Sequence, residues 1–205
     1  MGALEFLFDF GSPNAYLAHR ALPALEARTG TAVDYTPILL GALFKLTGNV
    51  PPLVAFKDVK GKTDYMRIEM RRFMRNHAIT QFKMNPAFPV NTIGMMRGAV
   101  VAKRDGFLPA YVEACFHHMW EAPKPMGDPA VMAAALTESG LDAVAIMRGI
   151  EEPEVKAELV RTTQHAVDRG VFGSPSFFVG SELFFGKDSL PDVEIEIRRH
   201  TQAAA

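Results

Sequence analysis

A serine directly before a predicted helix is the first residue of this chain that could do chemistry. Ser12 follows the apolar run from Leu4 to Phe10 and precedes Pro13, a residue type favoured at the first helical position. The start of a helix carries unpaired backbone N–H groups and a partial positive charge, and both favour a bound anion. The Ser12 hydroxyl could donate a hydrogen bond to such an anion, or it could simply cap the helix. We do not interpret Ser12 as an acyl-transfer nucleophile, because no histidine lies near it in a recognisable motif.

The single cysteine and the scattered histidines restrict the other chemistry that is open to the chain. Cys115 is the only cysteine, so one chain can form neither a disulfide nor a C-x-x-C redox pair nor a thiolate metal cage. His117 and His118 are neighbours on a predicted helix, about 100° apart, and cannot share a metal as an i, i+4 pair would. We therefore expect no metal site, and any thiol chemistry must come from a ligand.

Three loops carry further polar candidates. Ser174-Pro175 stands at the head of a predicted strand, where proline is tolerated chiefly at a sheet edge. Gly186-Lys187-Asp188-Ser189 precedes the last predicted helix, so Asp188 could cap that helix or bind a charged group of a ligand. Asn49 lies in a loop rich in glycine and proline, where it could be a turn residue or a polar contact to a ligand.

The elements that must position these groups begin with a β-α-β unit. The pattern predicts a strand over 4–10, a helix that starts at Pro13 and that Gly30 ends, and a second strand over 32–38. Two strands joined in this way are normally parallel, with a right-handed crossover.

The other end of the chain predicts a helix, a hairpin and a final helix. The first of these helices runs from Pro153 to Gly170, and strands over 174–179 and 182–185 flank Gly180-Ser181, a turn pair with glycine first as a type II′ turn prefers. The last helix extends to about His200. The order β-α-β followed by α-β-β-α is that of an α/β, thioredoxin-like fold.

The middle of the chain predicts helices only. Its apolar stripes recur at helical spacing, and no strand pattern is present between 39 and 152. We therefore expect a discontinuous thioredoxin-like domain formed by 1–38 and 153–205, with an inserted helical domain over 39–152. Four arginines on one of these helices favour a solvated face, although one of them could meet a substrate carboxylate. They are Arg67, Arg71, Arg72 and Arg75.

Charge and hydropathy exclude several classes of protein. The 205 residues contain 22 basic and 23 acidic side chains, a formal charge of -1, and these are spread along the chain. This balance argues against a nucleic-acid or membrane-surface footprint. The start of the sequence lacks the basic and apolar regions of a signal peptide, and no apolar run approaches the roughly 20 residues that span a bilayer. We expect a mature cytoplasmic protein.

Several segments together resemble a known family. The main ones run from Phe8 to Ala18 and from Gly170 to Val179; Gly48-Asn49, 85–92 and 185–188 follow the same pattern. In this order they resemble the 2-hydroxychromene-2-carboxylate isomerases, relatives of kappa-class glutathione transferases and of DsbA-type disulfide oxidoreductases. The resemblance covers nearly the whole chain, and it implies a homodimer that uses glutathione as cofactor.

The resemblance also implies roles for individual residues. Ser12 would donate a hydrogen bond to the glutathione thiolate, the backbone of Ser174 would pair with the peptide of glutathione, and Pro175 would be cis. The charged γ-glutamyl end would be held by Asp188 and its neighbours. Glutathione contacts are thereby expected at Ser12, Asn49, Ser174, Pro175, Gly186, Lys187, Asp188 and Ser189.

The implied reaction opens the ring of 2-hydroxychromene-2-carboxylate and yields trans-o-hydroxybenzylidenepyruvate, a step in aromatic-hydrocarbon breakdown. Asn85 and Lys45 are the expected contacts to this small aromatic carboxylate. The family lysine is expected one position earlier, where this chain has Phe44. Two alternatives stay open: a kappa-like glutathione transferase or peroxidase, and a non-catalytic thioredoxin-like binding module.

Overall fold

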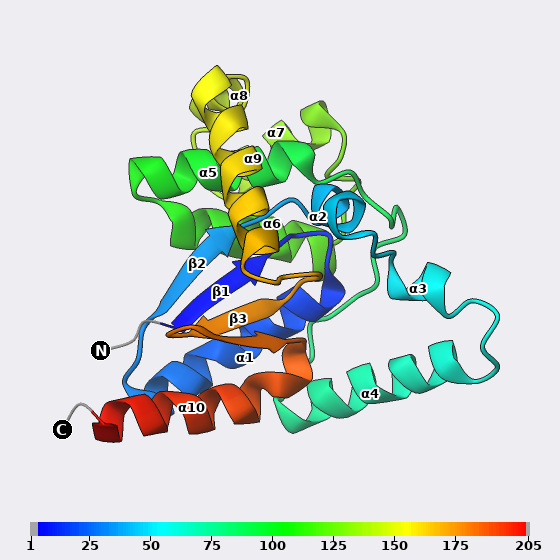
Figure 1. Ribbon diagram of the computed structural model, residues 1–205. Coiled ribbons are helices and arrows are strands. Elements are labelled where there is room, and N and C mark those ends of the chain that lie inside the picture. The colour runs from blue at the N-terminus through cyan, green and yellow to red at the C-terminus, as the bar shows by residue number, and fades with distance from the viewer. Residues whose placement is uncertain (1–3, 204–205) are drawn as a thin grey trace.

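The computed structural model describes residues 4–203, and a mixed four-stranded sheet lies at its centre (Figure 1). The strands are β1 (Leu4–Phe8), β2 (Val33–Pro37), β3 (Ser176–Val179) and β4 (Glu182–Phe185), in the spatial order β2-β1-β3-β4. β1 pairs with β2 in parallel and with β3 in antiparallel fashion, and β3 pairs with β4 in antiparallel fashion. This topology confirms the expected α/β, thioredoxin-like fold.

Two helices cover one face of the sheet, and the remaining helices lie over the other face and beside it (Figure 1). The first two are α1 (Pro13–Thr29) and α10 (Leu190–Ala203), the latter preceded by the 3-10 turn η1 (Lys187–Ser189). The helices between β2 and β3 are α2 (Leu40–Thr47), α3 (Pro52–Ala55), α4 (Lys62–Asn76), α5 (Ile93–Asp105), α6 (Leu108–Trp120), α7 (Pro129–Glu138), α8 (Ala143–Gly149) and α9 (Pro153–Asp168). Within the described residues no helix is long and apolar enough to cross a membrane.

Local signals set the ends of α1. Ser12 is the N-cap and accepts a hydrogen bond from the Ala15 backbone N–H, and Pro13 occupies the first turn. Gly30 ends the helix in the left-handed region at φ +69°, which a residue without Cβ adopts at little cost. Both ends lie where the sequence predicts them.

Aromatic side chains join the sheet to the helical segment in one core. Phe10 contacts Phe116 of α6 with ring centroids 4.9 Å apart, and the Trp120 indole donates a hydrogen bond of 2.9 Å to the Phe10 carbonyl. These three side chains are fully buried or nearly so. The predicted boundaries of the inserted domain fall in the loops between β2 and α2 and between α8 and α9.

Polar contacts reinforce the packing of α1 on α6. The Tyr16 hydroxyl donates to Glu121 at 2.8 Å, His19 lies 2.9 Å from Glu113, and Arg20 donates to Glu113 at 2.5 Å. α1 is thereby fixed on both sides: by the sheet beneath it and by α6 beside it.

Three strands are shorter than the sequence pattern predicts. β1 ends at Phe8 rather than Phe10, β2 covers 33–37 rather than 32–38, and β3 begins at Ser176 rather than Ser174. Side-chain contacts take the place of the sheet ladder at the end of β1, because the Asp9 backbone N–H donates to the Ser174 hydroxyl instead of a strand carbonyl. The predicted hairpin turn is present, with Gly180 at φ +60°.

Candidate functional site

Ser12 lies at the carboxyl end of β1, where the chain turns into α1. Only 5% of its surface is exposed, and its hydroxyl has two backbone partners. It accepts from the Ala15 N–H at 3.2 Å and donates to the Ser174 carbonyl oxygen at 2.8 Å. The capping role of Ser12 is therefore confirmed, and the donor hydrogen expected to reach a ligand is bound to Ser174.

The loop before β3 meets the Ser12 loop directly. The Ser174–Pro175 peptide bond is cis, as the family resemblance implies. Besides its carbonyl contact with Ser12, Ser174 accepts a hydrogen bond of 3.2 Å from the Asp9 backbone N–H at its hydroxyl. Residues from the two ends of the chain thus form one local structure.

Asp9 is the buried carboxylate of this site, and the sequence reasoning missed it. Its oxygens accept hydrogen bonds from the Gly11 N–H at 2.7 Å, the Leu40 N–H at 2.8 Å and the Thr92 hydroxyl at 3.1 Å. Burial raises the pKa of Asp9, and the three hydrogen bonds oppose this effect. Asp9 thereby links the starts of α1, α2 and α5. The sequence signal that could have identified Asp9 is an acidic residue two positions before a Gly-Ser-Pro turn.

Gly11 is needed beside this carboxylate. A Cβ at residue 11 would lie 3.0 Å from the Thr92 methyl carbon and 3.2 Å from Asp9 Oδ1. Both neighbours are fixed by their mutual hydrogen bond. A larger residue would therefore separate the start of α1 from that of α5.

The segment before α10 borders the Pro175 loop. The Gly186 N–H donates to the Pro175 carbonyl at 2.9 Å, and the Ser189 hydroxyl donates to the Gly186 carbonyl at 2.7 Å. Gly186 has φ +87° and ψ 155°, a backbone conformation that is essentially restricted to glycine. The side chain of Asp188 is two-thirds exposed, whereas that of Lys187 is buried and has its Nζ 2.5 Å from Asp188 Oδ2.

Asn49 joins this group of loops, and Lys45 does not. The Asn49 amide nitrogen donates to the Phe172 carbonyl at 2.7 Å, and its oxygen accepts from the Val50 N–H at 2.8 Å. Lys45 is exposed on α2, and its ammonium has no hydrogen bond or ion pair among residues 4–203. Asn49 therefore contacts the chain at Phe172, which is two residues before Ser174.

The side-chain amide of Asn85 is hydrogen-bonded to backbone groups. Its amide nitrogen donates to the carbonyls of Met119 at 3.1 Å and Lys124 at 2.9 Å, and its oxygen accepts from the Ala87 N–H at 2.9 Å. The side chain is 3% exposed. These contacts give Asn85 a role in holding the loop after α6, a role that sequence reasoning did not anticipate.

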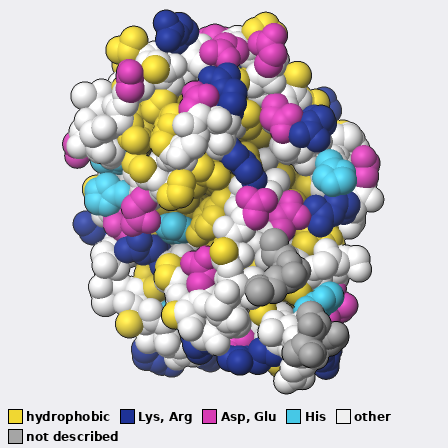
Figure 2. All heavy atoms as spheres, turned by 90° about the vertical axis from the view of Figure 1, so that its left-hand side faces the viewer, with side chains coloured by type: hydrophobic (Ala, Val, Ile, Leu, Met, Phe, Trp, Pro, Cys, Tyr) yellow, Lys and Arg dark blue, Asp and Glu magenta, His cyan; other side chains and the backbone are white. Residues whose placement is uncertain are grey.

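A separate cavity lies away from these residues. It has a volume of about 590 Å³ and lies between α5, α9 and the strands β1 and β2, with Glu5, Lys103 and Arg169 among its lining residues. Figure 2 views the molecule from the side where β1 and β2 begin, and hydrophobic side chains gather in the middle of this face between charged ones. The Ser12 loop follows the opposite end of β1, and none of the candidate residues lines the cavity.

The chain is similar in sequence to known proteins. The family described as DSBA-like thioredoxin domain matches residues 3–198. A 2-hydroxychromene-2-carboxylate isomerase from Pseudomonas putida is 30% identical over 192 residues, which are 91% of this chain and 90% of that protein. The chain belongs to the 2-hydroxychromene-2-carboxylate isomerases within the DSBA-like thioredoxin family.

Further matches agree with membership of the isomerase family. The solved structure of a 2-hydroxychromene-2-carboxylate isomerase superposes with a TM-score of 0.83 at 26% identity, covering 98% of this chain and 97% of that one. A shorter segment of 66 residues is 35% identical to glutathione S-transferase kappa 1 from Caenorhabditis elegans, and it spans 31% of this chain and 29% of that protein. The family resemblance of the sequence is confirmed.

In this member of the 2-hydroxychromene-2-carboxylate isomerase family, the start of α1 holds a hydroxyl and a buried carboxylate. The one thiol of the chain, Cys115 on α6, is buried, and burial raises its pKa to about 12. Among residues 4–203 no three His, Cys, Asp or Glu side chains are placed to hold a metal ion. The Ser12 O–H would reach an anion at the start of α1 only by leaving the Ser174 carbonyl.

Proposed function

We propose that the protein is a glutathione-dependent isomerase that converts 2-hydroxychromene-2-carboxylate to trans-o-hydroxybenzylidenepyruvate. The observation that carries this proposal is the contact of Ser12 with Ser174 at the start of α1, in a chain 30% identical to an isomerase of that name. A hydroxyl at a helix start and next to a backbone loop, in a chain whose single cysteine is buried, suits a thiolate that a ligand brings.

The residues at the start of α1 fit the sulfur of glutathione. When bound, glutathione supplies a thiolate that adds reversibly to the conjugated carbon, so that the former double bond can rotate before the thiol leaves unchanged. Ser12 stabilises the anionic sulfur by turning its O–H away from the Ser174 carbonyl, while the Ala15 N–H keeps the oxygen in place. This turn also frees the Ser174 carbonyl for an N–H of the glutathione peptide.

The loops around Ser12 hold the rest of the tripeptide. Asn49 and the backbone of Ser174 contact the cysteinyl and glycyl parts, and the segment 186–189 holds the γ-glutamyl end. For the substrate we propose a contact with Lys45, whose ammonium is exposed near the end of α2. Asn85 acts on the substrate side by supporting its loop, because its amide is used by backbone partners.

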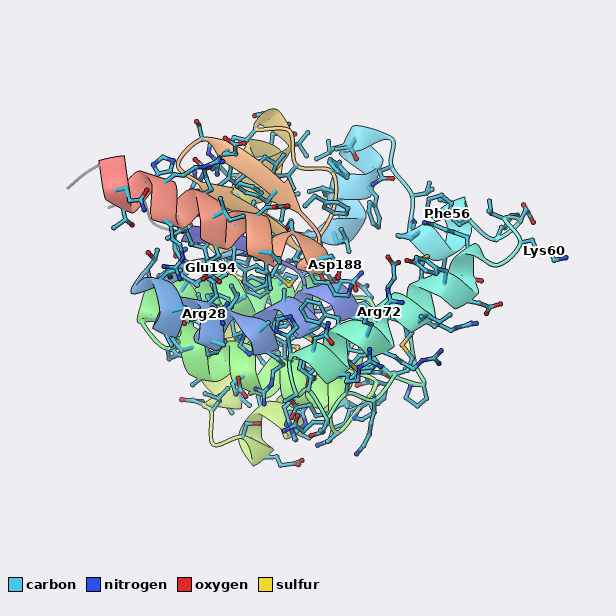
Figure 3. All side chains as sticks on the ribbon, turned by 90° about the horizontal axis from the view of Figure 1, so that it is seen from below. Arg28, Phe56, Lys60, Arg72, Asp188 and Glu194 are labelled. Atoms are coloured by element: carbon cyan, nitrogen blue, oxygen red, sulfur yellow. The ribbon has the colours of Figure 1, made fainter. Side chains whose placement is uncertain are left out.

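We also propose that two copies of the chain associate through the segment from α2 to α4. Large apolar side chains in this segment are 38% to 55% exposed, and Figure 3 shows Phe56 and Lys60 at its far end, beyond the other helices. Exposed apolar surface of this kind marks interaction sites. Light scattering on the purified protein tests the dimer, and a variant with Leu53→Glu and Val54→Glu should be monomeric. The exposed apolar residues are Leu46, Val50, Leu53, Val54, Phe56, Val59, Tyr65 and Ile68.

The function is tested by following 2-hydroxychromene-2-carboxylate optically, with and without glutathione. Conversion should need glutathione, should consume none of it, and should fall about 100-fold in Ser12→Ala, the loss typical of removing one donor to a developing anion. Ser12→Thr, which keeps the hydroxyl, should retain part of the activity, and Ser181→Ala in the exposed β3–β4 turn should retain all of it.

Other outcomes point to the alternatives. Steady loss of free thiol during turnover would favour a kappa-like transferase, the activity suggested by the 66-residue match. Conversion that proceeds equally well without glutathione would contradict the proposed mechanism. Absence of both conversion and glutathione binding would leave the non-catalytic binding module.

A further inference from the structure

The backbone of Asp9 is bonded to both loops of the candidate site. Its carbonyl oxygen accepts a hydrogen bond of 3.0 Å from the Ser12 N–H, and its N–H donates to the Ser174 hydroxyl at 3.2 Å. Ser12 and Ser174 are themselves joined by the hydrogen bond of 2.8 Å. Asp9 therefore belongs to the same hydrogen-bonded group as the hydroxyl proposed to bind the thiolate.

The carboxylate of Asp9 faces the starts of two helices other than α1. Oδ2 accepts from the N–H of Leu40, the first residue of α2, at 2.8 Å, and from the hydroxyl of Thr92, the N-cap of α5, at 3.1 Å. Because a helix start carries a partial positive charge, Asp9 offsets the positive ends of α2 and α5. The first turn of α1 contains no acidic residue. The start of α1 is thus the one of the three that remains for the anion of a ligand.

The charge of Asp9 is buried and has no cationic partner within residues 4–203. The residue is 1% exposed, and burial raises its pKa while the hydrogen bonds from Leu40, Gly11 and Thr92 lower it. The helix starts and the Ser174 loop around the carboxylate present N–H and hydroxyl groups and no charged side chain among the described residues.

The other charged candidates do not offset Asp9. Lys45 is exposed, and Lys187 is paired with Asp188. Asp9 is therefore the buried charge of the candidate site that no opposite charge neutralises.

We propose that Asp9 is a positioning residue whose negative charge sets the pH at which the bound glutathione thiol ionises. This inference rests on the proposed use of glutathione. Two acids that share one group of helix starts ionise one after the other, because the first negative charge opposes the second. An aspartic acid ordinarily ionises near pH 3.9 and a thiol near pH 8.5, at about those values in model peptides, so Asp9 ionises first.

The effect of Asp9 on the thiol is opposite to that of Ser12. The Ser12 hydroxyl and the start of α1 favour the thiolate, whereas the carboxylate of Asp9 opposes it. A thiol that ionises too readily is a weaker nucleophile, and the best attacking thiol ionises near the working pH. The two opposed effects keep the ionisation of the bound thiol close to neutral pH.

The test follows the ultraviolet absorbance of the thiolate in the glutathione complex as the pH is changed. γ-Glutamyl-serylglycine, which has a hydroxyl in place of the thiol, supplies the baseline at each pH. Asp9→Asn removes the charge and keeps the shape of the side chain. Its bound thiol should ionise about one pH unit lower than that of the unmodified chain, the effect of losing one nearby like charge.

Thr92→Val is the matched control, because it removes one hydrogen bond from the Asp9 carboxylate and leaves the charge in place. Its bound thiol should ionise at the same pH as that of the unmodified chain. If circular dichroism shows that Asp9→Asn does not fold, Asp9→Ser takes its place, since a hydroxyl oxygen is uncharged and can still accept from the Gly11 N–H.

Two results would overturn the role of Asp9 while glutathione dependence stands. One is an unaltered ionisation pH in the folded Asp9 variant. The other is an equal decrease in Thr92→Val, which would assign the effect to lost hydrogen bonding and not to lost charge. Failure of the unmodified chain to bind glutathione would instead overturn the proposed function, and this inference with it.

Discussion

The hydroxyl of Ser12 donates a hydrogen bond of 2.8 Å to the carbonyl oxygen of Ser174, a residue 162 positions later in the chain. Ser12 is buried and Ser174 is half-buried, and the same Ser12 hydroxyl caps α1. One side chain therefore stabilises a helix start, joins two loops, and supplies the O–H that we propose for ligand binding. Capping α1 and joining the two loops affect stability, and this effect can be measured separately from ligand binding.

Replacement of Ser12 by alanine should lower the free energy of unfolding by about 1.5 kcal/mol, because the helix loses its cap and Ser174 loses a donor. Urea unfolding followed by circular dichroism measures this change. Ser181→Ala, on an exposed turn, should leave the unfolding midpoint unaltered. A Ser12→Ala protein as stable as the unmodified one would contradict the bonding described.

Asp9→Asn should cost about 2 kcal/mol of stability, although the two side chains have the same shape. The carboxylate accepts from the N–H groups of Gly11 and Leu40 and from Thr92, and an amide would turn its NH₂ toward at least one of these donors. The melting temperature reports this loss. Asp168→Asn, at an exposed position on α9, is the control and should have the same melting temperature as the unmodified chain.

Acid should weaken the contact of α1 with α6 before the protein unfolds completely. The hydrogen bond from His19, with Arg20 nearby, lowers the pKa of Glu113 from 4.5 to about 2. Since the folded-state pKa lies below the unfolded one, the contribution of Glu113 is present above pH 4.5 and is lost as the pH falls toward 2.

The melting temperature, measured at intervals across this range of pH, should therefore fall more steeply for the unmodified chain than for Glu113→Gln. Above pH 5 both curves should run parallel. Curves that stay parallel down to pH 2 would show that Glu113 titrates normally.

Gly186→Ala should destabilise the protein by about 2 kcal/mol and weaken glutathione binding. No atom lies within 4 Å of a Cβ built at Gly186, so the cost arises from the backbone at φ +87° and not from crowding. Gly41→Ala provides the contrast, because its Cβ would also meet open space but Gly41 lies within α2. There alanine should be neutral or stabilising, since it is the better helix former.

The features that the sequence predicted well depend on neighbours along the chain. Ser12, Pro13 and Gly30 define α1 through contacts within four residues, and the turn at Gly180 needs only its own backbone conformation. Such signals are readable because the physical partners lie within the same short segment.

Asp9 and Asn85 show what the sequence could not reveal. Two of the three donors to Asp9 are 31 and 83 positions away, so only the folded chain identifies its carboxylate as a junction of three helix starts. Asn85 was expected at the substrate because of its motif, yet its amide holds backbone carbonyls 34 and 39 positions later. The roles of both side chains depend on hydrogen bonds to residues far along the chain, which no local sequence pattern encodes.

The position of β3 beside β1 also governs when the site can exist during synthesis. A nascent chain that ends at residue 150 already contains β1, β2 and every helix from α1 to α8, but it lacks Ser174 and the strand that pairs with β1. Its Ser12 hydroxyl has no distant carbonyl to meet. The ribosome must therefore release almost the entire polypeptide before the site can assemble, and a prematurely terminated product would be left without it.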